Sequence, residues 1–336
     1  MISIASANGL EATKLAFARM QNGVDPLDAV VAGVSLVEDD PNDTSVGYGG
    51  IPNEQGEVEL DAAVMHGPTH RVGAVAAMKN IRYASAVAKL VMQHSDHVLL
   101  AGEGALQFAK AFGFEEENLL TEQARKIWLY WKQTLSPRGD WLPPAIEDVD
   151  PEVAKFFRLE HLRTPEEQAL AAAEQPWSRP TGTIHCSAMN ADGDISCTTS
   201  TSGLAFKLPG RVGDSPIPGA GLFCDNAVGS CGSTGRGEAN LIHASSAAAV
   251  ELMRAGHSPK EAGLVLLRRI ADRSEDRLRD ESGRPNFGLK LYLLAKNGDH
   301  AGVSLWGPAT YAVTDANGTR LEPCVALYDR ESKTSS

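Results

Sequence analysis

Two short segments in the second half of the chain, joined by a tight turn, constrain the fold more than any other feature. The segments TIHCSAM (183–189) and ISCTTS (195–200) flank Asp192-Gly193. Asp-Gly between two strand-forming segments is a strong signal for a hairpin turn. The pattern therefore predicts an antiparallel pair of strands, so the chain must contain a sheet in which antiparallel pairing plays a part.

Helix signals lie on both sides of this hairpin in the sequence. Asn8, with Glu11 three residues later, predicts the start of a helix that ends at Gly23, and Asp25-Pro26 predicts the start of another. Further helices are expected at about 78–92, before Gly113, and at 164–174, 238–255 and 258–273, and further strands before Met65 and at 97–100, 288–296, 301–306 and 309–315. This order indicates an α+β fold, a layered sandwich rather than alternating β-α-β units.

Residues 136–182 differ in composition from the segments on either side. Prolines recur there among charged residues, together with Trp141 and Trp177. Proline and charge without an apolar period are typical of a connecting segment. The composition therefore predicts a linker that leads directly into the strand beginning at Thr183.

Charge and hydropathy exclude several classes of partner. The formal net charge is −12, and the basic residues are scattered rather than clustered, which argues against nucleic acid or an anionic membrane. No apolar run approaches the ~20 residues that span a bilayer. The start of the chain, MISIA, lacks a basic segment followed by a long apolar one. A cytoplasmic protein is therefore favoured, and a periplasmic one stays open if a signal was removed.

Neither a metal site nor a disulfide framework is indicated. The cysteines are odd in number and contain no C-x-x-C pair, so they are predicted to be mainly reduced core residues; they are Cys186, Cys197, Cys224, Cys231 and Cys324. No ligand spacing is shared by His66, His70, His94 and His97. No cofactor and no catalytic metal are expected.

The junction Pro180-Thr181-Gly182-Thr183 is the strongest chemical signal in the chain. A threonine hydroxyl is a weak nucleophile unless a base lies beside it. Cleavage before Thr183 would supply that base, because the new α-amine has a pKa of about 7.7 to 8 and can accept the hydroxyl proton. The alternative is that Thr183 merely opens a strand. No H-E-x-x-H, G-x-S-x-G or Walker motif indicates a different chemistry.

Two long segments resemble a known family. They are residues 43–81, which include DTSVGYGG and ELDAAVMHG, and residues 181–238, which include the specific string GRVGDSPIPGAG. Both resemble the glycosylasparaginase branch of the N-terminal-nucleophile asparaginases, and the likeness extends from about Asn8 to 273. It implies a four-layer αββα sandwich, cofactor-free hydrolysis of the side-chain amide of an asparagine derivative, and a homodimer of cleaved αβ units.

The resemblance also implies the chemical roles of single residues. Thr183 corresponds to the nucleophile, which becomes a new N-terminus when the Gly182–Thr183 bond is cut into chains 1–182 and 183–336 of one domain. Thr201 corresponds to a second threonine that orients the nucleophile. Thr234 and Gly235 correspond to the oxyanion hole, one hydroxyl and one backbone N–H directed at the developing negative charge.

Two further residues correspond to the substrate-binding pair of the family. Arg211 matches the arginine that binds the substrate α-carboxylate, a role that suits a guanidinium fork. Asp214 matches the acid that binds the α-ammonium. Several alternatives remain open: Arg211 and Asp214 could form a structural ion pair with each other, Thr201 could be an ordinary strand residue, and His185 could act as the base in place of the α-amine.

The substrate follows less directly from the resemblance. The family carries a tryptophan near the N-terminus that shapes the substrate site, and the alignment places Ile4 at that position, with a shifted register possible. The leaving group could therefore be a glycosylated amine, ammonia from L-asparagine, or the peptide nitrogen of a β-aspartyl dipeptide. The first is favoured, on the stretch GYGGIP (47–52) and on Phe206-Lys207. A non-catalytic amino-acid-binding relative is the remote alternative, and a sodium ion near 47–60 is a further open point.

Overall fold

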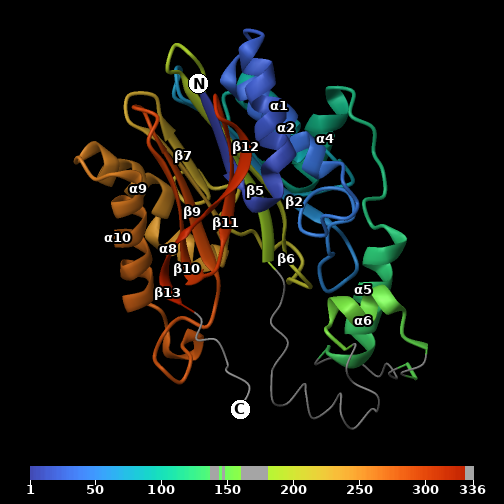
Figure 1. The fold of residues 1–336 in the computed structure, drawn as a ribbon. Coiled ribbons are helices and arrows are strands. Elements are labelled where there is room, and N and C mark those ends of the chain that lie inside the picture. The colour runs from blue at the N-terminus through green and yellow to red at the C-terminus, as the bar shows by residue number, and fades with distance from the viewer. Residues whose placement is uncertain (137–143, 146–147, 160–180, 330–336) are drawn as a thin grey trace.

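The computed structural model describes residues 1–136, 144–145, 148–159 and 181–329 of the chain (Figure 1). Its α-helices are α1 (Leu10–Gln21), α2 (Pro26–Glu38), α3 (Ala84–His94), α4 (Gly102–Ala111), α5 (Glu122–Thr134), α6 (Pro151–Phe156), α8 (Gly237–His243), α9 (Ser245–Arg254) and α10 (Pro259–Asp272). Its strands are β1 (Ile2–Ser6), β2 (Glu59–His66), β3 (Arg71–Lys79), β4 (Leu99–Ala101), β5 (Thr181–Met189), β6 (Ile195–Leu204), β7 (Leu222–Asp225), β8 (Gly229–Gly235), β9 (Leu289–Ala295), β10 (His300–Gly307), β11 (Thr310–Asp315), β12 (Gly318–Pro323) and β13 (Val325–Asp329).

The strands form two sheets, so the fold is of the mixed α+β class. One sheet has the order β12-β11-β1-β5-β6-β2-β3-β4 and the other has the order β13-β10-β9-β8-β7. Helices cover the outer faces: Figure 1 shows α1 and α2 on one side of the molecule and α9 and α10 on the other. Most neighbouring strands are antiparallel, as the Asp192-Gly193 hairpin predicts, although β3 pairs with β4 and β10 with β13 in parallel.

Apolar side chains fill the space between the sheets and under the helices. The core between the sheets takes residues from both of them, including Ile4, Met65, Leu222 and Tyr292. A second core packs α1, α2 and α3 against the first sheet, and a third packs α9 and α10 against the second sheet. A smaller cluster joins α5 and α6 to the loop after β6, where Trp131 stacks on Phe206.

The β5–β6 hairpin lies in the middle of the larger sheet. β5 pairs with β1 on one side and with β6 on the other, and β6 continues the sheet to β2. β1 itself lies between β5 and β11. Strands from residues 1–182 and from residues 183–336 are therefore interleaved in this sheet, with β1 inserted between β11 and β5, and Thr183 lies near the start of a central strand.

Several local predictions are confirmed. Asp25 accepts a hydrogen bond from the Leu27 backbone N–H and caps α2, which begins with Pro26. α10 begins with the expected capping box of Ser258 and Glu261. The cysteines are all free, and all except the half-buried Cys324 are buried.

Two predicted helix starts are wrong. Helix α3 begins at Ala84 rather than 78, because residues 71–79 form β3, paired with β2 and β4 on either side. The prediction assigned only the last two residues of this strand, Met78 and Lys79, to the helix, because periodicity alone cannot separate a short buried strand from a helix. Asn8 does not cap α1; its amide bonds to Ser6 and Asp43 instead, and Gly9 occupies the cap position. The helix predicted at 164–174 lies outside the described residues.

Candidate active site

Thr183 lies at an irregularity in the β5–β6 ladder. Gly182 pairs with Gly203 and Ile184 pairs with Ser200, so Thr183 stands opposite both Thr201 and Ser202. Such an extra residue on one strand changes the direction of the neighbouring side chains, and bulges of this kind are common beside active sites. The local ladder thus sets Thr183 apart from the regular pairing of its strand.

The hydroxyl groups of Thr183 and Thr201 converge on one carbonyl. The Thr183 Oγ1 and the Thr201 Oγ1 each donate to the Gly182 carbonyl oxygen at 2.7 Å, and the two hydroxyl oxygens lie 3.2 Å apart. Thr201 is only 2% exposed and also accepts from the Gly203 backbone N–H. The carbonyl of the Gly182–Thr183 peptide bond is therefore polarised by the hydroxyl of the residue that follows it and by a buried neighbour.

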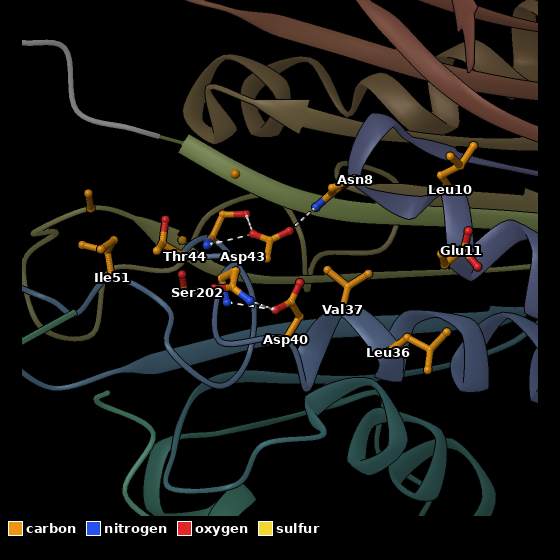
Figure 2. A pocket seen from close by; sticks show the side chains of 15 residues that line it. Asn8, Leu10, Glu11, Leu36, Val37, Asp40, Asp43, Thr44, Ile51 and Ser202 are labelled. Atoms are coloured by element: carbon orange, nitrogen blue, oxygen red, sulfur yellow. Dashed lines mark hydrogen bonds between the residues drawn. The ribbon is translucent and has the colours of Figure 1, made fainter. Parts of the chain in front are cut away.

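A loop after α2 packs directly against Gly182. A Cβ atom on Gly182 would lie 2.0 Å from the Ser45 Cβ and 2.2 Å from its Oγ. The Ser45 hydroxyl donates to Asp43 at 2.5 Å, and the Asp43 carboxylate also accepts from the Asn8 amide at 2.8 Å. Figure 2 shows Asp43 directed toward Asn8 in the cavity of about 880 Å³ on this side of Gly182. Only glycine fits at position 182 with this loop in place.

Arg211 forms its ion pair with Glu238, not with Asp214. The Arg211 Nε and Nη2 donate to one Glu238 carboxylate oxygen at 2.9 and 2.7 Å. Burial tends to raise the pKa of Glu238, but the Arg211 charge and hydrogen bonds outweigh burial, and the net pKa is below its ordinary value. The mutual ion pair considered for Arg211 and Asp214 is therefore not formed.

Asp214 is a buried carboxylate with neutral partners. It is 7% exposed and accepts from the Ser233 hydroxyl at 2.5 Å and from the Asn240 amide at 2.8 Å. Burial raises its pKa, and the two hydrogen bonds oppose that effect without cancelling it. Asp214 and Arg211 line the same cavity of about 1030 Å³, which also reaches Thr183, Thr201 and Gly235.

Thr234 and Gly235 end strand β8 beside the same threonine. Thr234 lines a smaller cavity of about 340 Å³ together with Thr183, and its hydroxyl is hydrogen-bonded to the Tyr292 hydroxyl at 2.9 Å. Gly235 lines both this cavity and the larger one. The structure thus brings the seven sequence-predicted residues around two cavities that share part of their lining; these residues are Gly182, Thr183, Thr201, Arg211, Asp214, Thr234 and Gly235.

The His185 ring is hydrogen-bonded to side chains other than the Thr183 hydroxyl, which a base for Thr183 would contact. Its Nδ1 is bonded to the Thr199 hydroxyl at 2.9 Å and its Nε2 to the Ser187 hydroxyl at 2.8 Å. Burial lowers its pKa to about 3. With both ring nitrogens engaged elsewhere, His185 is a core residue between the sheets.

Sequence reasoning missed several residues that line these cavities. Ser45 lies in the segment SVGYGG (45–50), where a serine in a glycine-rich loop carries no signal of a role. Glu238 gave no signal of its own, because a single glutamate in a helix is commonplace. Lys290 gave a usable signal: it is a charged residue within the apolar strand LKLYLLA. Ile4 is fully buried between the sheets, and the N-terminal residues that line the smaller cavity are Ser6, Ala7 and Asn8.

No group of three or more histidine, cysteine, aspartate or glutamate side chains in the described parts of the chain is arranged to hold a metal ion. No described helix combines the length and the apolar content needed to cross a bilayer.

Comparison with known proteins points to one family. The sequence profile described as asparaginase matches residues 5–278. The N(4)-(β-N-acetylglucosaminyl)-L-asparaginase of Elizabethkingia miricola is 36% identical over 318 residues, 94% of this chain and 81% of that protein. An Arabidopsis thaliana protein named as a probable isoaspartyl peptidase/L-asparaginase 3 is 36% identical over 312 residues, 90% of this chain and 84% of that protein.

Proposed function

The chain belongs to the asparaginase family of amidohydrolases, and on that premise we propose that Thr183 is both its self-cleavage site and its catalytic nucleophile. The observation that carries this assignment is the convergence of the Thr183 and Thr201 hydroxyls on the Gly182 carbonyl oxygen, each at 2.7 Å. A hydroxyl held beside the carbonyl of its own preceding peptide bond is ready for an intramolecular attack, which proximity accelerates.

Maturation begins with attack of the Thr183 Oγ1 on the Gly182 carbonyl carbon. The C–N bond then breaks, the hydroxyl proton passes to the departing nitrogen, and an ester joins Gly182 to the Thr183 oxygen. Water hydrolyses this ester and releases chains 1–182 and 183–336. The Thr183 α-amine, freed when the C–N bond breaks, accepts the hydroxyl proton during turnover, once hydrolysis of the ester has freed that hydroxyl.

Turnover repeats the same chemistry on the substrate side-chain amide. Thr183 attacks the amide carbonyl, the amine leaves, and water hydrolyses the β-aspartyl ester to aspartate. Thr234 and Gly235 stabilise the oxyanion. The Thr234 hydroxyl donates to that oxyanion while accepting from the Tyr292 hydroxyl, a direction that the 2.9 Å contact permits.

The amino-acid end of the substrate binds in the larger cavity. Arg211 pairs with the α-carboxylate and Asp214 with the α-ammonium. Glu238, the present partner of Arg211 at 2.7 Å, keeps the guanidinium oriented, and the remaining N–H groups of the fork are free to bind substrate.

Two substrates suit this assignment. N(4)-(β-N-acetylglucosaminyl)-L-asparagine is the first candidate, in keeping with the name of the Elizabethkingia relative. β-Aspartyl peptides and L-asparagine are the second, in keeping with the name of the Arabidopsis relative and with small Ala7, rather than a large ring, in the cavity beside Thr183.

The same premise extends to the architecture. The two facing sheets with helices on both outer faces support a four-layer αββα sandwich of the N-terminal-nucleophile type, made jointly by both chains. Two cleaved αβ units form the proposed homodimer, a state that light scattering after size exclusion can test.

The deciding experiment is the intact mass of the purified protein under denaturing conditions. Two fragments that meet between Gly182 and Thr183 are expected, together with release of aspartate from a panel of β-amides. Thr183→Ala should remain one chain without activity, whereas the matched Thr183→Ser keeps a hydroxyl and should still be cleaved. A cleaved, active alanine variant would refute the assignment of Thr183.

A further inference from the structure

Lys290 stands on the same face of the second sheet as Thr234. β8 and β9 are antiparallel, and Lys290 is the direct partner of Thr234 in their ladder. Directly opposed residues share one face of a sheet, and so do residues two apart on a strand. Tyr292 therefore lies on this face as well; it is buried, bonded to Thr234, and stacked parallel to the His185 ring of the other sheet. The Lys290 side chain thus belongs to the space between the sheets, at the end where Thr183 lies.

Two cavities meet at this point, and Lys290 lines both. The larger one contains Arg211 and Asp214, and the smaller one contains Ala7 and Thr234. Thr183 is shared by the two cavities, as Lys290 is. Arg211 and Asp214 line the larger cavity but not the smaller one. A substrate held by them therefore has its amide at Thr183 and its leaving amine beside Lys290 and Thr234.

The Lys290 ammonium lacks a counter-ion in the described part of the chain. No hydrogen bond or ion pair joins it to any described residue, although Lys290 is half-buried. The nearby acids have other partners: Asp43 accepts from Ser45 and Asn8, Asp214 from Ser233 and Asn240, and Glu238 from Arg211. A cation that has lost part of its hydration without gaining a partner is costly, and a bound anion would offset that cost.

From this arrangement we infer that Lys290 is a specificity-determining residue that binds a carboxylate on the leaving amine of the substrate. The inference rests on the proposed function, because it uses the orientation that Arg211 and Asp214 give to the amino-acid end. It distinguishes the two candidate substrates. The leaving amino acid of a β-aspartyl dipeptide carries a carboxylate near the scissile nitrogen, whereas a glycosylamine is neutral and would leave the ammonium unpaired. β-Aspartyl dipeptides are therefore the better substrates.

The test compares two substrates that differ by a single charge. β-Aspartylglycine and β-aspartylglycinamide present the same scissile bond, but only the first carries the carboxylate. For the cleaved wild-type enzyme, kcat/KM should favour the acid by about tenfold, a discrimination within reach of one close charge pair. The preference should weaken as ionic strength rises, because salt screens partly solvated charges.

The variants assign that preference to Lys290. Lys290→Met should bring the ratio of the two kcat/KM values close to one, whereas Lys290→Arg keeps the charge and should retain most of the preference. The control Lys260→Met, at an exposed position on α10, should leave the ratio as in wild type. If Lys290 had only a structural role, Lys290→Met would lower kcat/KM for both substrates by the same factor and leave their ratio unchanged. An equal ratio in wild type, or an unchanged ratio in Lys290→Met, overturns the inference while β-amide hydrolysis stands. The proposed function would instead be overturned if cleaved wild-type protein hydrolysed none of four substrates: β-aspartylglycine, β-aspartylglycinamide, L-asparagine and glycosylasparagine.

Discussion

Gly182→Ala is the substitution whose effect follows most directly from the structure. The added Cβ would lie 2.0 Å from the Ser45 Cβ and 2.2 Å from its Oγ. Carbon atoms in contact are ordinarily about 3.5 to 4.0 Å apart, so Gly182 or the Ser45 loop must move by about 1.5 Å. The moving group carries the carbonyl that accepts from Thr183 and Thr201.

A displacement of this size should slow self-cleavage strongly. A misplacement of about 1 Å can cost about 100-fold in rate when reacting groups must be aligned. We therefore expect Gly182→Ala to be cleaved about 100-fold more slowly than wild type, while the chain still folds. The assay is a time course of intact mass after rapid purification, with the fraction of uncleaved chain fitted to one exponential.

Two controls separate this steric cause from general damage. Ser45→Gly, added to Gly182→Ala, removes both atoms of the clash and should make cleavage faster than in the single Gly182→Ala variant, with Ser45→Gly alone as reference. Gly104→Ala introduces a methyl group with no atom within 4 Å and should be cleaved at the wild-type rate. Cleavage of Gly182→Ala at the wild-type rate would show that close packing of Ser45 on Gly182 does not govern the reaction.

Three further predictions concern buried groups. Burial raises the pKa of Asp214 above its ordinary 3.8. Because ionised Asp214 is proposed to bind the substrate α-ammonium, the KM for substrate should rise as pH falls through the raised value. Ser233→Ala removes a hydrogen bond that lowers this pKa and should move the rise in KM to higher pH, whereas an unchanged profile of KM against pH would contradict the role of that bond. Burial also raises the pKa of Glu38 above 4.5, so its contribution to stability is complete below pH 4.5 and is lost as pH rises through the raised value. In the uncleaved Thr183→Ala chain, adding Glu38→Gln should flatten this part of the plot of urea-unfolding free energy against pH, and a profile parallel to that of the Thr183→Ala chain would contradict this role of Glu38. Trp131 is 4% exposed and stacks on Phe206 with the ring centroids 4.4 Å apart. Trp131→Ala should therefore lower the unfolding free energy of the uncleaved Thr183→Ala chain by about 3 to 5 kcal/mol. A loss below about 1 kcal/mol would mean that the cluster around Trp131 is not part of the cooperative core.

The sequence predicts the local signals of the fold better than its long-range arrangement. The turn at Asp192-Gly193 and the caps at Asp25 and Ser258 depend on a few adjacent residues, and each is found where expected. Most of β3 received no prediction, and its last two residues, Met78 and Lys79, were assigned to a helix, because its neighbours β2 and β4, which decide its conformation, come from other parts of the chain. The order of strands in the larger sheet depends on the same distant pairings.

The candidate site shows the same division. The predicted site residues line two cavities that share part of their lining. They could be predicted because the resemblance supplied distant information that no local pattern contains. Their partners were not predictable: Glu238 approaches Arg211 from α8, and Ser45 approaches Gly182 from the loop after α2. Lys290 could have been found, since a lysine within an apolar strand requires a reason to be there.

The mixed origin of the strands in the larger sheet has a consequence for the protein if it is cut between Gly182 and Thr183, as proposed. The seams between β11 and β1, β1 and β5, and β6 and β2 each join a strand from residues 1–182 to one from residues 183–336. Two polypeptides held in this way should not come apart on dilution, because dissociation requires all three ladders to open together with the core beneath them. Once unfolded, they must find each other again in a second-order step, so recovery of the cut protein should depend on concentration while that of the uncut chain does not. The proposed self-cleavage would thus convert a molecule that folds by itself into one whose persistence depends on the barrier to unfolding.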